Sequence, residues 1–137
     1  MLLIFIGSTD VLSAVHTGGF ILPLLKFLGF VDNPKNMEHL HAIIRKCGHI
    51  TEYAILASLL FRALTIVSQE SSEKQFKVKI AIAFLLSAFY AMSDEFHQSF
   101  IPSRTASLID VSIDCFGAFL ALLIIGVGIT LRVRSRA

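Results

Sequence analysis

The chain has 137 residues, enough for one compact domain and too few for two on the usual length scale. Hydrophobic residues make up 55% and charged residues 16%, against roughly 25% charge in soluble domains, so the composition excludes an ordinary soluble domain and indicates a protein that lies in lipid. The net charge of +2 is small and the basic residues form short clusters without interleaved aromatics, so nucleic acid is excluded as a partner.

The first thirty residues are apolar but interrupted. Residues 1–7 are too short to span a membrane, and a polar Ser-Thr-Asp step separates them from a second apolar run, residues 11–30, which contains His16, Pro23 and Lys26. We favour the end of a truncated first span followed by an interfacial or re-entrant helix, because the polar residues suit an interface. Two alternatives stay open: residues 11–30 are the span itself, or the start is a signal peptide, although no basic segment precedes it.

Three later stretches, residues 47–67, 78–93 and 108–131, are long enough, or nearly so, to cross a bilayer as helices of about 20 residues. The middle stretch is short unless its helix continues through residues 94–98, whose polar side chains would then have to face protein or water. Before them, residues 32–45 are predicted to be a polar connector with a turn at its start that leads into a helix. The predicted fold is all-α, a small polytopic transmembrane helical bundle of about three to four spans plus an N-terminal interfacial or re-entrant helix.

Two cysteines lie in apolar stretches. Cys47 and Cys115 form no CxxC pair and no zinc-type pattern with histidine, so we expect buried free thiols rather than a disulfide.

Basic residues predict the orientation. Residues 68–77, their flanks Arg62 and Lys79, and the basic tail at residues 132–136 should lie on the cytoplasmic side of a bacterial inner membrane. Because successive spans alternate in direction, the start of the 47–67 span and residues 94–107 then share the external side. Lys35, Arg45 and Lys46 are a counter-signal, but these two polar segments share a face in either orientation.

Polar residues recur at helical spacing in all three spans. Half of the ten acidic residues lie in or beside apolar stretches, where each charge costs about 2.5 to 3.5 kcal/mol. Lys46, His49 and Arg104 are the cations that could compensate them. Each set predicts one polar face of its helix: Lys46, His49, Glu52 and Tyr53 on the first; Tyr90, Asp94, Glu95 and Gln98 on the second; Asp110, Asp114 and Gly117, the last as a packing contact, on the third.

These residues carry a family resemblance. The segment KCGHITEYAIL (residues 46–56) resembles the KxxHxxEYaxL signature of VanZ-like integral membrane proteins, and DEFHQSFIPSR (residues 94–104) resembles their DExxQxFxPxR segment. Asp110 through Asp114 to Gly117 is similar to their closing DxxxN/DxxG pattern. The resemblance covers about residues 38–125, so we divide the chain into an N-terminal segment (1–37), a VanZ-like domain (38–125) and a last-span end with a basic tail (126–137). It implies a multi-span protein whose name-giving relative contributes to resistance to teicoplanin, without implying a reaction.

Two site roles are predicted from the polar residues. His49, Glu52, Asp94 and Glu95 are candidate catalytic residues, because imidazole and carboxyl groups in an apolar setting transfer protons. Candidate ligand-binding residues are Lys46, Tyr53, Gln98, Arg104, Asp110 and Asp114, with Arg104 and Lys46 suited to a phosphate or carboxylate.

The function classes remain open. The first is an enzyme, and the second a non-catalytic binding protein, for a lipid-linked or cell-wall ligand at the external face. The third is a structural or assembly partner of other membrane proteins, in which polar contacts lock the bundle. A transporter is least favoured. Membrane lipid is the general partner, and the sequence pattern identifies neither a cofactor nor an oligomeric state. No metal site is predicted, although His49 and Glu52 could join Asp94 or Glu95 as metal ligands.

Overall fold

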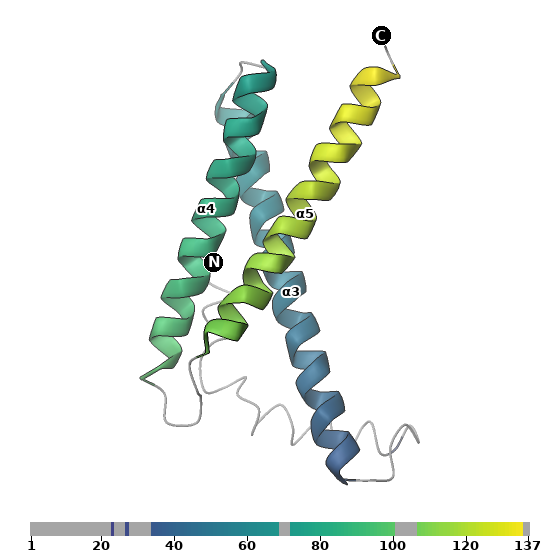
Figure 1. Ribbon diagram of the computed structural model, residues 1–137, viewed down its shortest axis with the longest axis vertical. Coiled ribbons are helices and arrows are strands. Elements are labelled where there is room, and N and C mark those ends of the chain that lie inside the picture. The colour runs from purple at the N-terminus through teal and green to yellow at the C-terminus, as the bar shows by residue number, and fades with distance from the viewer. Residues whose placement is uncertain (1–22, 24–26, 28–33, 69–71, 101–106, 136–137) are drawn as a thin grey trace.

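The chain forms a bundle of long helices (Figure 1). The computed structural model describes residues 23, 27, 34–68, 72–100 and 107–135. Within these residues the chain is helical, with α3 (Pro34–Val67), α4 (Glu73–Gln98) and α5 (Leu108–Arg134) each long and apolar enough to cross a membrane. The three predicted spans are confirmed, whereas the predicted first span and interfacial helix lie outside the described residues.

Helix α3 begins earlier than predicted. Residues 34–45 were expected to form a connector, but the helix already starts at Pro34, where proline's fixed φ and missing N–H suit a first helical turn. Its 34 residues make α3 about 50 Å long, well over the ~30 Å hydrocarbon core. Its first third projects beyond α4 and α5 (Figure 1), which leaves Arg45 and Lys46 exposed.

Helices α4 and α5 begin at serine caps. The Ser72 hydroxyl accepts a hydrogen bond from the Gln75 backbone N–H at 3.3 Å, and the Ser107 hydroxyl accepts one from Ile109 at 3.2 Å. Asp110 lies in the first turn of α5, where its carboxylate is near the positive end of the helix dipole.

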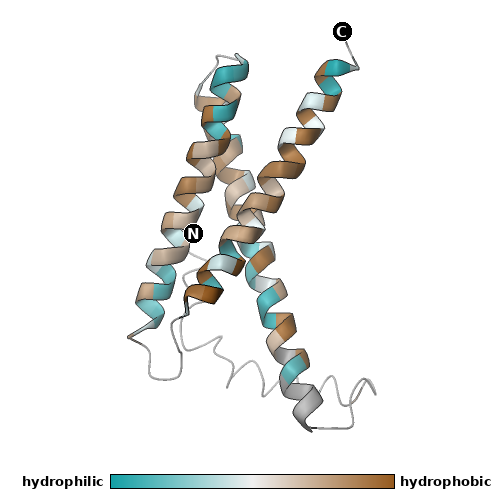
Figure 2. Cartoon of the chain, viewed as in Figure 1, coloured by the Kyte–Doolittle hydropathy of each residue, from teal (hydrophilic) through white to brown (hydrophobic). Residues whose placement is uncertain are grey.

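Small side chains let the helices pack closely. Ala57, Ala83 and Ala118 are fully buried in one cluster with Phe61 and Leu122, and a second cluster contains Tyr53, Leu56 and Ala91. Small residues let the backbones of two helices approach closely. Because lipid is as apolar as the core of the bundle, such close van der Waals packing drives helix association in a membrane. Large apolar side chains face outward instead, and Figure 2 shows the apolar midsection between polar helix ends.

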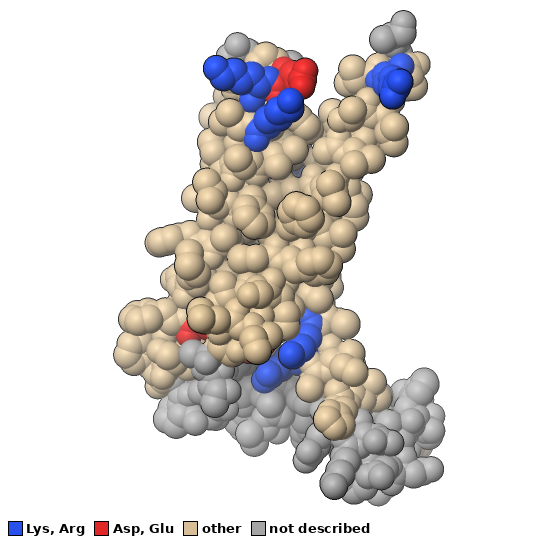
Figure 3. Space-filling model, in the orientation of Figure 1, with Lys and Arg blue, Asp and Glu red and all other residues tan. Residues whose placement is uncertain are grey.

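The helix ends define two polar ends of the bundle. The end of α4 and the start of α5 lie beside α3 at one end, and the start of α4 and the end of α5 lie at the other (Figure 1). For the described residues of the two polar segments, the prediction that they share a face is therefore confirmed. Lysine and arginine side chains gather at both ends (Figure 3).

Candidate functional site at one end of the bundle

The site is built around a close crossing of α3 and α5. A Cβ atom at Gly117 would lie 2.9 Å from the Ile50 Cα and 3.0 Å from its carbonyl carbon, and it would collide with the Ile50 carbonyl oxygen. Only glycine fits here without moving one helix, because the obstacle is backbone. The predicted packing role of Gly117 is confirmed.

An ion pair flanks this crossing. His49 is the neighbour of Ile50 and Asp114 lies one turn before Gly117, which brings His49 Nδ1 to 3.4 Å from Asp114 Oδ1. The contact is not an aligned hydrogen bond, and it is an ion pair when His49 is protonated. The Asp114 side chain is 3% exposed and that of His49 24%, so Asp114 is enclosed while His49 keeps a face to the outside. A carboxylate at Nδ1 orients an imidazole and leaves Nε2 for a ligand or a proton.

Tyr53 lies one turn beyond His49 on α3 and is completely buried. Its hydroxyl has no hydrogen-bond partner among the described residues, although the carboxylates of Asp114 and Asp94 lie near enough to interact with it electrostatically. The ring packs at 6.4 Å from that of Tyr90 on α4, a residue of the predicted polar face that was not assigned a site role. Leaving a buried hydroxyl without a hydrogen-bond partner costs about 1 to 3 kcal/mol.

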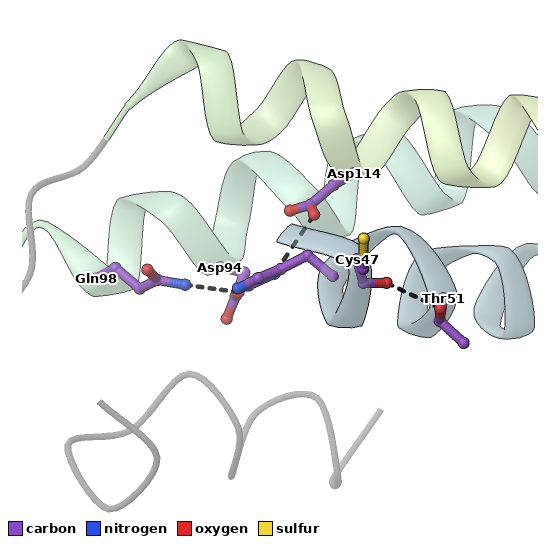
Figure 4. Close-up of polar contacts among 6 residues, drawn as sticks. Cys47, Thr51, Asp94, Gln98 and Asp114 are labelled. Carbon is purple, nitrogen blue, oxygen red and sulfur yellow. Dashed lines mark hydrogen bonds and ion pairs between the residues drawn. The ribbon is translucent and has the colours of Figure 1, made fainter. Parts of the chain in front are cut away.

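The last turn of α4 supplies further buried polar groups. Asp94, Glu95 and Gln98 are 5%, 7% and 6% exposed, which confirms that this turn faces protein. Gln98 Nε2 donates to Asp94 Oδ2 at 2.9 Å within α4 (Figure 4). Glu95 Oε1 accepts from the backbone N–H of Ser107 at 2.5 Å and so joins α4 to the start of α5. Ser107 was missed in the sequence, although a serine just before an apolar run is a helix-start signal.

The other predicted site residues differ in how far they are buried. Glu52 and Asp110 are half-buried, and Glu52 lies within electrostatic range of His49 and Asp114. Lys46 shares the predicted polar face with His49 but is exposed, because α3 projects past its neighbours there. Arg104 lies outside the described residues.

The cysteines are free, as predicted, but not buried. Cys47 is exposed on the projecting part of α3, and Cys115 is half-buried. The predicted burial was therefore wrong, since an apolar stretch in a membrane protein also has a face that packs against no helix.

The four residues His49, Tyr53, Asp94 and Asp114 are called the polar cluster below. It combines an imidazole–carboxylate pair, which can transfer a proton, with carboxylates that accept hydrogen bonds from amine or hydroxyl groups. No three His, Cys, Asp or Glu side chains in the described part of the chain are placed to hold a metal ion, so the metal alternative gains no support there.

Comparison with known proteins covers almost the whole chain. A family model described as VanZ/LLP1 matches residues 1–129, which extends the similarity from the three motifs into the N-terminal third. No curated protein and no solved structure is significantly similar to the chain. The family assignment therefore depends on the family model and on the motifs, whose residues include all four members of the polar cluster. The chain belongs to the VanZ/LLP1 family of proteins.

Proposed function

We propose that this protein binds a lipid-linked or other cell-envelope ligand at the external face of the bacterial cytoplasmic membrane, through the polar cluster, and thereby affects glycopeptide susceptibility. One observation carries the proposal: a His49–Asp114 ion pair stands beside a buried Tyr53 hydroxyl that has no partner among the described residues. Bundle packing alone does not require this combination, because a phenylalanine would fill the same space without a desolvated hydroxyl.

The depth of the cluster suits a ligand anchored in lipid. Asp94 lies four residues before the end of α4, and Asp114 six residues after the start of α5, so both lie about 6 to 9 Å inside the helix ends. This is the region where lipid headgroups meet acyl chains. A ligand anchored by its own acyl chain would present its polar part to the cluster there.

A catalytic role would use the same residues. His49 would act as general base or acid with Asp114 orienting it, while the cations Lys46 and Arg104 would bind a phosphate or carboxylate of the ligand. A binding protein needs the charges but no proton transfer. Charge-preserving changes such as Glu95→Asp and Arg104→Lys should therefore weaken a binding protein only partly.

The orientation is part of the proposal. Lys74, Lys77, Arg132 and Arg134 lie at the end opposite to the cluster, and an excess of such residues favours the cytoplasmic side. A C-terminal fluorescent-protein fusion should be fluorescent and an alkaline phosphatase fusion inactive. The reverse result would place the cluster in the cytoplasm.

A structural lock is the second candidate function. The observation that favours it is that the His49–Asp114 pair ties α3 to α5 beside the Gly117 crossing. In that case the cluster would hold the bundle together for assembly with another membrane protein.

Complementation of a deletion strain separates the two functions. Wild type, His49→Ala, Asp114→Asn and Arg104→Ala would be compared for glycopeptide and envelope-stress sensitivity, with the membrane abundance of each variant measured. Thr51→Val and Ser112→Ala are matched controls, because both hydroxyls are exposed and bond only to their own helix. Abundant cluster variants that fail to rescue would support ligand binding. Full rescue by all three would exclude it, and loss of rescue only with loss of protein would favour the lock.

A further inference from the structure

A groove separates α4 from α5 at the end opposite to the polar cluster. The two helices diverge towards that end (Figure 1), and the space between them has a volume of about 640 Å³. Its walls are almost wholly apolar. Phe76, Ile80 and Phe84 are the large apolar residues on the α4 side, and Phe119, Leu123 and Val127 are among those on the α5 side.

The groove has the length of one bilayer leaflet. It runs along α4 from Phe76 to Phe84 and along α5 from Phe119 to Leu131, which at the helical rise is about 12 to 18 Å. Half of a ~30 Å hydrocarbon core is about 15 Å. An extended acyl chain from one leaflet would therefore fit along the groove.

Basic side chains surround the polar end of the groove. Lys77 lines it, Lys74 lies one turn earlier on α4, and Arg134 continues the α5 face formed by Val127 and Leu131. Among the described residues at this end, the carboxylate of Glu73 opposes them in an exposed pair with Lys77 at 2.7 Å, and three basic groups against this one carboxylate leave a net positive charge there. Figure 3 shows Lys and Arg side chains at the ends of both helices, with a notch between the two ends.

We propose that this groove binds one acyl chain of an anionic phospholipid, whose phosphate lies among Lys74, Lys77 and Arg134. Basic residues near a membrane surface attract anionic headgroups, and these three stand where the headgroup of a seated chain would lie. A second copy of this chain is a poorer occupant, because symmetric pairing through the groove would bring two basic ends together. The site is separate from the polar cluster, so the proposal does not depend on the proposed function.

The chain contains no tryptophan, so one introduced tryptophan reports on its own surroundings. Phe119→Trp would place the reporter in the groove, and Leu120→Trp at the same depth outside its lining. Each full-length variant would be reconstituted in phosphatidylcholine vesicles with a minor fraction of brominated phosphatidylglycerol or brominated phosphatidylcholine. Bromine on the acyl chain quenches only a tryptophan that it contacts.

At Phe119→Trp we expect brominated phosphatidylglycerol to quench at least twofold more than brominated phosphatidylcholine, and at Leu120→Trp we expect equal quenching. Adding Lys74→Gln, Lys77→Gln and Arg134→Gln should remove the preference, while Arg45→Gln with Lys46→Gln at the other end should keep it. Equal quenching by both lipids at Phe119→Trp would overturn the proposal. So would protection of that tryptophan from both lipids, since protein would then occupy the groove.

Discussion

Gly117 of α5 lies against the backbone of Ile50 in α3, and this contact places the neighbouring His49 within 3.4 Å of Asp114. The ion pair and the glycine are parts of one arrangement, because the pair can form only where the two backbones approach closely. The chemistry of the site therefore depends on the packing beneath it. Substitution of the glycine should change the stability of the bundle, and substitution of the pair should remove one contact between α3 and α5.

Gly117→Ala should destabilise the bundle by at least about 1 to 3 kcal/mol, because the added methyl group meets backbone that cannot rotate away. The free energy of unfolding in mixed micelles measures the effect. Gly48→Ala is the matched control on α3, where an added Cβ meets nothing within 4 Å. It should leave stability unchanged or raise it by about 0.5 to 1 kcal/mol, since alanine is the better helix former. A loss at Gly48 as large as that at Gly117 would contradict the packing argument.

The His49–Asp114 pair should show energetic coupling. A double-mutant cycle with His49→Ala and Asp114→Ala is expected to give about 0.6 kcal/mol and at most about 1.7 kcal/mol, the average and the maximum measured for polar contacts between membrane helices. A cycle with Thr51→Val and Ser112→Ala should give none, because each of these side chains bonds within its own helix. Additive effects of the first two substitutions would show that the observed contact is not an interaction.

Tyr53→Phe should separate stability from function. Removing a buried hydroxyl that lacks a partner among the described residues should leave stability unchanged or raise it by about 1 kcal/mol, while the ring contact with Tyr90 is kept. The proposed function predicts that this stable variant fails to complement a deletion strain. Full complementation would mean that the hydroxyl contacts no ligand.

Much of this arrangement could be predicted from the sequence because helical spacing places residues on faces. The repeats through Asp94 and Asp114 predicted that each residue lies on the polar face of its helix, and the structure shows both carboxylates buried. The need to extend the middle span through Gln98 followed from the ~30 Å that a helix must cross, and α4 ends there.

Spacing does not show where a neighbouring helix stops. Lys46 belongs to the same stripe as His49, yet it is exposed because α3 continues past the ends of its partners. Nor does it show contacts between a side chain and a distant backbone, so the hydrogen bond from Ser107 to Glu95 could not be anticipated.

That hydrogen bond gives Glu95 a structural role that must be distinguished from the predicted catalytic one. Glu95→Ala should cost about 1 to 3 kcal/mol, because it leaves the Ser107 N–H without its acceptor. Glu95→Gln keeps an oxygen in the same place and should retain most of the stability while removing the charge. Unfolding in mixed micelles and complementation would be measured for both variants. If Glu95→Gln is stable but does not complement, the charge serves the ligand or a proton transfer. If it complements as well as wild type while Glu95→Ala does not, Glu95 acts by joining α4 to α5, and the catalytic assignment at this position is wrong.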